Sequence, residues 1–273
     1  MADKLGIIAG GGALPRRLID ACRRSGRDFF VLALRGQAEQ VTLQNAPHRW
    51  VGLGAVDEAV KILKSEGVKT VVLAGSVRRP SLFEMKPDLR ALQVFVKLGM
   101  SAFGDDTLLR AVTQELEKDG FSLVGAHEID PGLLTPEGVL TKKKAPTPAH
   151  QADIDYGIRA ARALGALDIG QAVVVQQGIV LGVEAVEGTD ELLQRCRMLR
   201  KKGRGGVLVK LAKPQQDKRL DLPAAGVMTV AKAYEAGLEG IALEAGASLL
   251  LDPDSVSAAA DRMGLFIVGV RPT

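Results

Sequence analysis

The sequence predicts an α/β fold with two domains: an N-terminal doubly wound, Rossmann-like domain and a second, C-terminal α/β domain with a mixed sheet. Three observations predict it. Short apolar runs alternate with amphipathic runs through residues 1–125, which is typical of a parallel sheet with helical crossovers. A proline- and lysine-rich stretch interrupts this alternation at residues 131–150. With 273 residues, 47% of them hydrophobic, the chain is long enough for two cores.

In the first domain we expect each apolar run to form a strand and each amphipathic run a helix. The runs KLGIIAG, FFVLAL and KTVVLAGS are rich in β-forming residues, and Gly120 is a suitable end for the long helical run before it. The predicted elements are strands at 4–10, 29–34, 69–76 and 121–126, and helices at 14–24, 56–65 and 105–120.

The segment PGLLTPEGVLTKKKAPTPAH has neither helical nor strand periodicity, so we interpret it as a linker. The expected organisation is therefore a nucleotide-binding domain at 1–130, a linker at 131–150 and a second domain at 151–273. The run AVVVQQGIVLGVEAV predicts a hairpin closed by Gln177 and Gly178. The other elements predicted here are strands at 206–212, 240–245 and 248–252, and helices at 151–167, 190–200, 228–236 and 254–263.

Composition excludes several classes of protein. The net charge is only +4, from 36 basic and 32 acidic residues, and aromatic residues are few, so we expect no nucleic-acid partner. Cys22 and Cys196 lack the spacing of metal or redox motifs, which fits a reducing compartment. Because no apolar run reaches about 20 residues and the start lacks a signal-peptide pattern, we expect a cytoplasmic protein.

A glycine-rich turn follows the first predicted strand. Glycines between a strand and a helix let the backbone approach a phosphate, which the helix N-terminus then stabilises. A dinucleotide site would need a third glycine where Pro15 stands and an acid where the second strand ends at Arg35, so we exclude a nicotinamide cofactor. The candidate substrate-binding residues of this turn are Gly10, Gly11, Gly12, Ala13 and Leu14.

A second turn of the same kind, LAGSVRRP, ends the strand at 69–76 and adds Gly75 and Ser76 as candidate substrate contacts. The stretch FGDDTLL opens the next helix. These turns would meet at the carboxyl edge of a parallel sheet, where such folds bind nucleotides. A purely structural glycine run, and an N-cap role for Asp105 or Asp106, remain alternatives.

Five motifs give the chain a resemblance to a known family. In order they are GIIAGGGALP, LAGSVRRP, FGDDTLLRAV, AVVVQQGIVLGVEAVEGTDELLQR and LVKLAKPQQDKRLDLPAAGVMTV. The chain resembles the LpxI family of UDP-2,3-diacylglucosamine pyrophosphatases. The resemblance implies a bacterial enzyme of lipid A biosynthesis that releases 2,3-diacylglucosamine 1-phosphate (lipid X) and UMP with Mg²⁺. It also implies a nucleotide-binding N-terminal domain, a lipid-product C-terminal domain and a homodimer.

Hydrolysis of a pyrophosphate requires three things: groups that neutralise the charge on its oxygens, a water molecule positioned for in-line attack on phosphorus, and stabilisation of the leaving phosphate. The stretch EAVEGTD offers carboxylates, which suit magnesium: Glu184, Glu187 and Asp190. We take Glu187 as a candidate metal ligand, and Thr189 and Asp190 as candidate substrate contacts. The alternative is that Thr189 or Asp190 caps the following helix.

The stretch KLAKPQQDKRLDLP mixes acids and bases directly after an apolar strand. We expect Lys213 and Arg219 to contact phosphate. By their position in the family's motif, Asp217 and Asp221 are candidates for metal ligand or base. Further candidate substrate contacts are Lys210 and Gln216. A solvated charged loop is the alternative interpretation.

Position 225 departs from the acid series of this motif. Ala224 and Ala225 stand where we would look for a further acid, so we hypothesise that Ala225 occupies a catalytic position and that this chain is an inactivated variant.

Rival functions share part of this pattern. A UDP-sugar transferase would use the same glycine turns, and a nucleotide- or lipid-binding module would bind without turnover. The substrate's two acyl chains, and the basic run TKKK, also suggest peripheral contact with the inner membrane.

Overall fold

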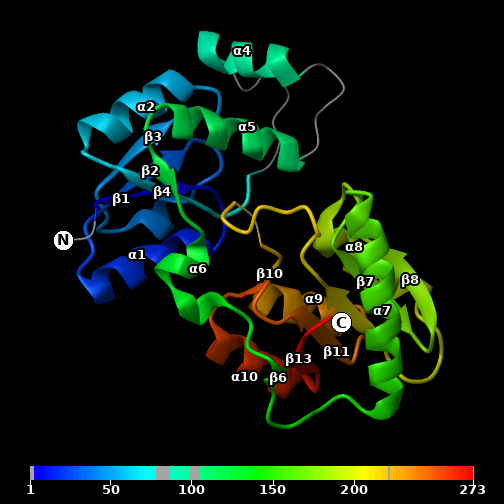
Figure 1. The fold of residues 1–273 in the computed structure, drawn as a ribbon. Coiled ribbons are helices and arrows are strands. Elements are labelled where there is room, and N and C mark those ends of the chain that lie inside the picture. The colour runs from blue at the N-terminus through cyan, green and yellow to red at the C-terminus, as the bar shows by residue number, and fades with distance from the viewer. Residues whose placement is uncertain (1–2, 78–86, 99–104, 221, 273) are drawn as a thin grey trace. The chain divides into compact units, whose positions relative to one another are not determined.

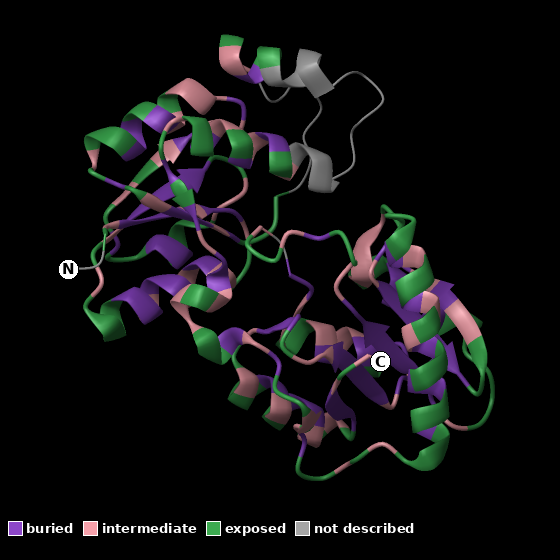
Figure 2. Ribbon diagram, in the orientation of Figure 1, coloured by how far each residue is buried: buried purple, intermediate pink, exposed green. Residues whose placement is uncertain are grey.

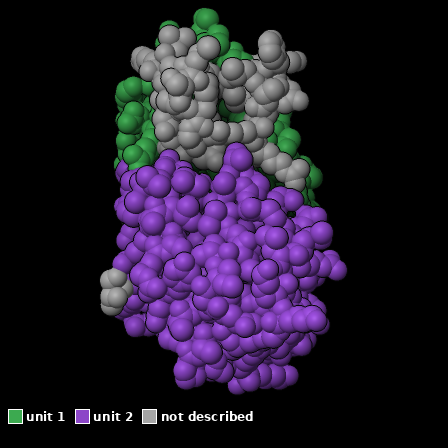
Figure 3. All heavy atoms as spheres, turned by 90° about the vertical axis from the view of Figure 1, so that its right-hand side faces the viewer, with its two compact units in different colours: residues 1–131 green, residues 132–273 purple. Residues whose placement is uncertain are grey.

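The computed structural model describes residues 3–77, 87–98, 105–220 and 222–272, with side chains in these ranges except at 94–108. The chain divides into two compact units: unit 1 is Met1–Pro131 and unit 2 is Gly132–Thr273 (Figure 3). Within the described residues, unit 1 has one sheet and unit 2 has two, and each unit has its own buried apolar residues (Figures 1 and 2).

Unit 1 is the predicted doubly wound domain. Its sheet has the order β3-β2-β1-β4-β5, and all neighbouring strands are parallel. Helices α1 and α6 cover one face and α2 and α5 the other (Figure 1). Its elements are β1 (Leu5–Ala9), α1 (Leu14–Ser25), β2 (Phe29–Leu34), a 3₁₀ turn (Gln40–Leu43), β3 (His48–Val51), α2 (Val56–Ser65), β4 (Thr70–Ala74), α4 (Leu89–Leu98), α5 (Asp105–Lys118), β5 (Ser122–Leu123) and α6 (Ala126–Ile129).

The central strand explains why the prediction for unit 1 succeeds. β1 has parallel neighbours on both sides, and Leu5, Ile7 and Ala9 are completely buried. A strand between two parallel neighbours with helices on both faces reads as a continuous apolar run. The elements β3 and α4 were not expected. In the described sheet β3 is an edge strand that pairs with β2. Because it begins with the polar residues His48 and Arg49, it does not form the apolar run by which the other strands were predicted.

Unit 2 contains the mixed sheet that the sequence predicts. Its order is β6-β13-β11-β9-β7-β8; β9, β11 and β13 are parallel, and β6 and β7 run against them. A two-stranded sheet of β10 and β12 lies apart. Its elements are β6 (Gly138–Val139), α7 (Pro148–Ala166), β7 (Ala172–Gln176), β8 (Ile179–Val183), α8 (Gly188–Leu199), β9 (Val207–Lys210), β10 (Ala224–Ala225), α9 (Val227–Glu235), β11 (Gly240–Glu244), β12 (Leu249–Leu250), α10 (Pro253–Met263) and β13 (Phe266–Val270).

Alternating side chains of β7 and β9 build a core on each face of this sheet. Val173 and Val209 pack with Ile154 of α7, whereas Val174 and Leu208 pack with side chains of α8, α9 and α10. The predicted hairpin is present, and its turn residues Gln177 and Gly178 have φ of 52° and 75°. Two positive φ angles in a two-residue turn are typical of type I′, whose twist matches that of paired strands.

The segment predicted as a linker is part of unit 2. The chain divides between Pro131 and Gly132, and residues 131–150 include a 3₁₀ turn (Pro131–Leu133), strand β6 and the first turn of α7. β6 pairs with β13 through only two residues, and Thr147 caps α7. Elements this short carry no periodicity, so the prolines dominate the sequence pattern.

Both cysteines are buried and unpaired. Burial raises the pKa of Cys196 to about 11, so its thiol stays protonated at neutral pH. None of the helices in the described ranges is both long enough and apolar enough to span a membrane.

Candidate active site

Polar side chains follow three strands of the unit 2 sheet at the same edge. Glu184 follows β8, Lys210 ends β9 and Glu244 ends β11. Because these three strands run in the same direction, their carboxyl ends share one edge of the sheet. Backbone N–H groups hold both acids: Gln171 donates to Glu184 at 3.2 Å and Ala212 donates to Glu244 at 2.9 Å. We call this the carboxyl edge of unit 2.

A buried cation, a hydroxyl and a carboxylate meet there. The Nζ of Lys210, which is 7% exposed, donates to Thr189 Oγ1 at 2.9 Å and to the Ala224 carbonyl at 3.1 Å. Thr189 Oγ1 in turn donates to Glu184 Oε1 at 2.7 Å. A buried ammonium is costly unless polar groups surround it, so this arrangement fixes a positive charge in place.

The first turn of α8 lies beside this cation, since Thr189 is its second residue. Within the described part of the chain no side chain caps this N-terminus, where backbone N–H groups and the helix dipole favour an anion. Asp190, in the same turn, forms an ion pair with Lys232 of α9, which offsets its negative charge. Lys210 and the α8 amides therefore make a place suited to a phosphate group.

The charged loop after β9 is attached to the turn between α7 and β7. Lys213 Nζ lies 2.7 Å from Asp168 Oδ1, and the Lys213 N–H donates to Gln216 Oε1 at 3.1 Å. Arg219 and Asp217 form an ion pair with Nη2 and Oδ2 2.8 Å apart. Each of the two expected phosphate-binding cations is thus held by a carboxylate. The candidate Asp221 lies outside the described residues.

The expected metal ligands are not grouped in the described part of the chain. Glu187 forms an ion pair with Arg195 and accepts the Ala185 N–H at 3.2 Å, while Asp217 is held by Arg219. Among the described residues no three or more His, Cys, Asp or Glu side chains are placed to hold an ion.

In unit 1 the two glycine turns touch each other at the carboxyl edge of the parallel sheet. Gly11 and Ser76 exchange backbone hydrogen bonds of 2.8 and 3.0 Å, and the Gly10 N–H donates to Ala74. A Cβ on Gly10 would lie 2.4 Å from the Ser76 carbonyl oxygen, and one on Gly75 would lie 2.3 Å from that of Gly11. These two glycines are required by the close approach of the turns.

Gly12 has a different role, because a Cβ there would meet nothing within 4 Å and its φ is +85°. It turns the chain into α1, which begins at Leu14 after Ala13; its first turn has no acid, and no side chain of the described ranges caps it. This open, uncapped helix N-terminus has the features of an anion site. Arg78 and Arg79 lie outside the described residues, as do the side chains of Asp105 and Asp106.

Two protein-family models match this chain, one in each unit. Residues 4–133 match the LpxI N-terminal domain and residues 136–268 match the LpxI C-terminal domain. The chain is also 47% identical over 276 residues to the UDP-2,3-diacylglucosamine pyrophosphatase LpxI of Caulobacter vibrioides, covering 98% of each sequence. The chain belongs to the LpxI family.

Solved structures are only distantly similar to this LpxI chain. CobK precorrin-6A reductase has a TM-score of 0.29 and 15% identity, covering 100% of this chain and 90% of that one. The biotin carboxylase subunit of pyruvate carboxylase has a TM-score of 0.26 and 13% identity, covering 64% of this chain and 35% of that one.

Ala225 does not occupy an open position in the LpxI C-terminal domain. It lies in β10, is 2% exposed and belongs to the apolar core together with Leu250 and Val230. An aspartate here would be buried among apolar side chains. The hypothesis that Ala225 marks a lost catalytic acid therefore finds no support in its surroundings.

The structure adds residues to the candidate site that the sequence motifs did not single out. Glu184 was expected only as one of several carboxylates, yet it is buried and bound by Thr189. Asp168, which holds Lys213, was not expected at all. Its positive φ of 57° marks it as a turn residue between α7 and β7, and a lone acid in a turn gives no sequence signal of a partner 45 residues away.

Proposed function

We propose that this chain hydrolyses the pyrophosphate of UDP-2,3-diacylglucosamine to 2,3-diacylglucosamine 1-phosphate (lipid X) and UMP. The observation that carries the proposal is the 47% identity, over 98% of both sequences, to a protein named for this pyrophosphatase activity. The carboxyl edge of unit 2 supports it, since its buried lysine and uncapped helix N-terminus suit a phosphate.

The reaction places negative charge on phosphate oxygens as the bridging bond breaks, and fixed positive groups stabilise that charge. Lys210 is fixed by Thr189 and the Ala224 carbonyl, so little reorganisation is needed when substrate arrives. We assign Lys210, Thr189 and the first-turn amides of α8 to a substrate phosphate, with Asp190 and Gln216 near it.

In this proposal Lys213 and Arg219 bind a substrate phosphate by exchanging their present ion-pair partners for it. Both are in ion pairs, with Asp168 and Asp217, that a substrate phosphate would have to displace. An Arg–carboxylate pair at a partly exposed site contributes little stability, so such an exchange costs little. Asp217, released from Arg219, is then available as a metal ligand or as a base.

Magnesium dependence is part of the proposal, with Asp217, Asp221 and Glu187 as ligands. Carboxylate oxygens are the ligands that Mg²⁺ prefers, and the ion would neutralise pyrophosphate oxygens. In the described residues Glu187 and Asp217 are occupied by arginines, so they do not form a site by themselves.

We assign the UDP group to unit 1, at the two glycine turns. The first turn contributes an open, uncapped helix N-terminus to the nucleotide's phosphates, and the second supports it through Gly75 and Ser76. We also propose that the chain is a cytoplasmic homodimer that contacts the inner membrane peripherally, because its substrate carries two acyl chains.

The experiment that tests this function is product identification. The chain is incubated with UDP-2,3-diacylglucosamine and Mg²⁺, with and without EDTA, and the uridine products are separated by chromatography. UMP that disappears with EDTA is expected. Release of UDP would indicate a UDP-sugar transferase, and tight binding without any uridine product would indicate a nucleotide- or lipid-binding module; either result contradicts the proposal. UMP formation that persists in EDTA would contradict the magnesium assignment alone.

A further inference from the structure

The C-terminal end of α8 and the loop after it form a compact basic and apolar surface, which we call the α8 basic segment (residues 197–204). Seven of its eight residues are cationic or apolar, and Met198 is 87% exposed and Leu199 45% exposed. Single exposed apolar residues are normal on a protein surface, but Met198 and Leu199 are adjacent and stand within a run of cations, a combination that suits an interaction site. Its cations are Arg197, Arg200, Lys201, Lys202 and Arg204.

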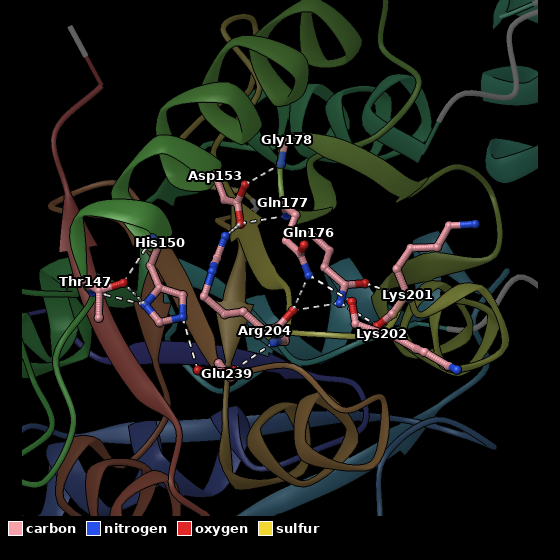
Figure 4. A network of polar contacts seen from close by, with 11 residues as sticks. Thr147, His150, Asp153, Gln176, Gln177, Gly178, Lys201, Lys202, Arg204 and Glu239 are labelled. Carbon is pink, nitrogen blue, oxygen red and sulfur yellow. Dashed lines mark hydrogen bonds and ion pairs between the residues drawn. The ribbon is translucent and has the colours of Figure 1, made fainter.

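Two glutamines of the β7–β8 hairpin hold the loop by its backbone (Figure 4). Gln176, completely buried, donates to the carbonyls of Lys201 and Arg204 at 2.9 and 2.7 Å and accepts the Lys201 N–H at 2.9 Å. Gln177 donates to the carbonyls of Lys202 and Arg204. Because these bonds turn the backbone inward, the side chains of Lys201 and Lys202 point away from the network (Figure 4).

The loop is anchored a second time through charge. Arg204 Nη2 lies 2.6 Å from Oδ2 of Asp153, which is 1% exposed and also accepts the N–H groups of Gln177 and Gly178. Arg204 is thus structural, whereas no acidic side chain in the described ranges pairs with Lys201 or Lys202. The segment is a rigid support that presents unpaired cations to solvent.

The same helix connects this surface with the candidate active site. Thr189 lies in the first turn of α8 and Met198 in its last, a separation of about 14 Å along a helix that rises about 1.5 Å per residue. Val186, fully exposed, precedes the helix, and Ile179, 52% exposed, begins the neighbouring edge strand β8. Apolar side chains are therefore exposed near both ends of the α8–β8 edge.

We propose that the α8 basic segment binds an anionic phospholipid bilayer and that the α8–β8 edge faces the membrane. Unpaired lysines supply attraction to anionic headgroups, and Met198 and Leu199 enter the boundary of the acyl chains. A nucleic-acid surface would instead combine cations with aromatic stacking platforms, and this segment has none. This orientation would bring a membrane-held lipid to the Thr189 end of α8, and that part rests on the proposed function.

Vesicle sedimentation of the full chain tests the proposal. The vesicles contain phosphatidylcholine alone or phosphatidylcholine with 30% phosphatidylglycerol, a proportion of about one anionic lipid in three. The variant Lys201→Gln/Lys202→Gln removes two unpaired charges. Lys142→Gln/Lys143→Gln is the control and removes two exposed lysines of the TKKK run, the other basic stretch considered for membrane contact, whose backbone N–H groups donate to the carboxylate of Asp261. Met198→Ser tests the apolar contact separately.

Binding to the anionic vesicles only, weakened by salt, is the expected result. Since each lysine near such a surface contributes about fivefold, the Lys201/Lys202 variant should bind about 25-fold more weakly, and the control within about twofold of the unaltered chain. Equal binding by all variants, equal loss in the control, or preference for single-stranded RNA over vesicles would overturn the proposal.

Activity measurements separate this proposal from the proposed function. With substrate in non-ionic detergent micelles the Lys201/Lys202 variant should release UMP at the unaltered rate, and with substrate in anionic vesicles it should be slower. If neither protein releases UMP from micelles, the proposed function fails, while the vesicle-binding result stands by itself.

Discussion

The two ends of α8 use charge in opposite ways. At its N-terminal end, Lys210 is buried and fixed by Thr189 and the Ala224 carbonyl. At its C-terminal end, Lys201 and Lys202 are exposed, and the loop that carries them is held by its backbone and by the Arg204–Asp153 ion pair, so neither lysine side chain is itself fixed. A fixed, desolvated charge acts strongly on one neighbour at short range, whereas an exposed charge acts weakly on a whole surface. The buried charge at the first end is suited to stabilising a phosphate during the reaction. The exposed charges at the second end are suited to attracting an anionic surface.

The largest effect is expected from the anchor of the basic segment. Asp153→Ala would remove a buried carboxylate and leave Arg204 and two backbone N–H groups without it. Breaking such a pair should lower the free energy of unfolding by about 3 to 5 kcal/mol. Chemical denaturation would measure this, with the exposed Asp155→Ala as control. A loss below about 1 kcal/mol would mean that the loop is held in another way.

At the N-terminal end of α8, Lys210 donates to the carbonyl of Ala224 in β10. The variant Ala225→Asp tests whether β10 has room for an acid. Burying a carboxylate in the apolar core should cost about 2 to 4 kcal/mol and give no gain in UMP release. Ala185→Asp, exposed at the same edge, should change stability by less than about 0.5 kcal/mol. A stable and more active Ala225→Asp variant would restore the hypothesis of a lost catalytic acid.

A smaller effect is expected where charges are paired but partly exposed. Asp168→Asn would release Lys213 and should lower the free energy of unfolding by at most about 1 kcal/mol, because solvent screens the pair. If Lys213 binds phosphate, the freed side chain should leave KM for the substrate the same or lower. A large rise in KM would show that Asp168 itself positions the substrate.

The smallest expected effect is the pH dependence of stability that comes from His150, in the first turn of α7. Burial, together with the charge of Arg204, lowers the pKa of His150 below its usual value. Nδ1 accepts the Thr147 N–H, so neutral His150 carries its proton on Nε2, facing Glu239 (Figure 4).

The unfolded chain therefore protonates His150 first, and stability should fall as the pH drops below about 6.5, the unperturbed histidine pKa. Thermal unfolding at pH 7.5 and 5.5 would measure this. His150→Gln should be less stable at pH 7.5 but should lose less on acidification. Equal pH dependence in both proteins would contradict the assignment.

The sequence predicts the fold well where each apolar run is a complete buried strand, as in β1, β2 and β7. It fails where an element is short or polar: β3 begins with the polar residues His48 and Arg49, and β6 and β10 have two residues each. These elements are determined by neighbours distant in sequence. β6, for example, is a strand only because it pairs with β13.

For the site, the sequence identifies residue types but not partners. It predicts that Lys210 and Thr189 bind substrate, and the structure brings their side chains together. It gives no indication that Asp168 holds Lys213 or that Arg195 holds Glu187, since ion pairs between separate elements depend on packing. The hypothesis at Ala225 stays a prediction; it rests on the motif alone, in which the burial of a short strand is not visible.

The central claim is that the carboxyl edge of unit 2 carries out the hydrolysis, and replacing Lys210 tests it most directly. Lys210→Met keeps a side chain of similar length but removes the charge beside Thr189. UMP release from UDP-2,3-diacylglucosamine should fall by about 10²- to 10³-fold, as for other fixed groups that stabilise charge in a transition state. The circular dichroism spectrum should be kept, and Lys142→Met should be fully active. UMP release within about threefold of the unaltered chain would place the reaction elsewhere.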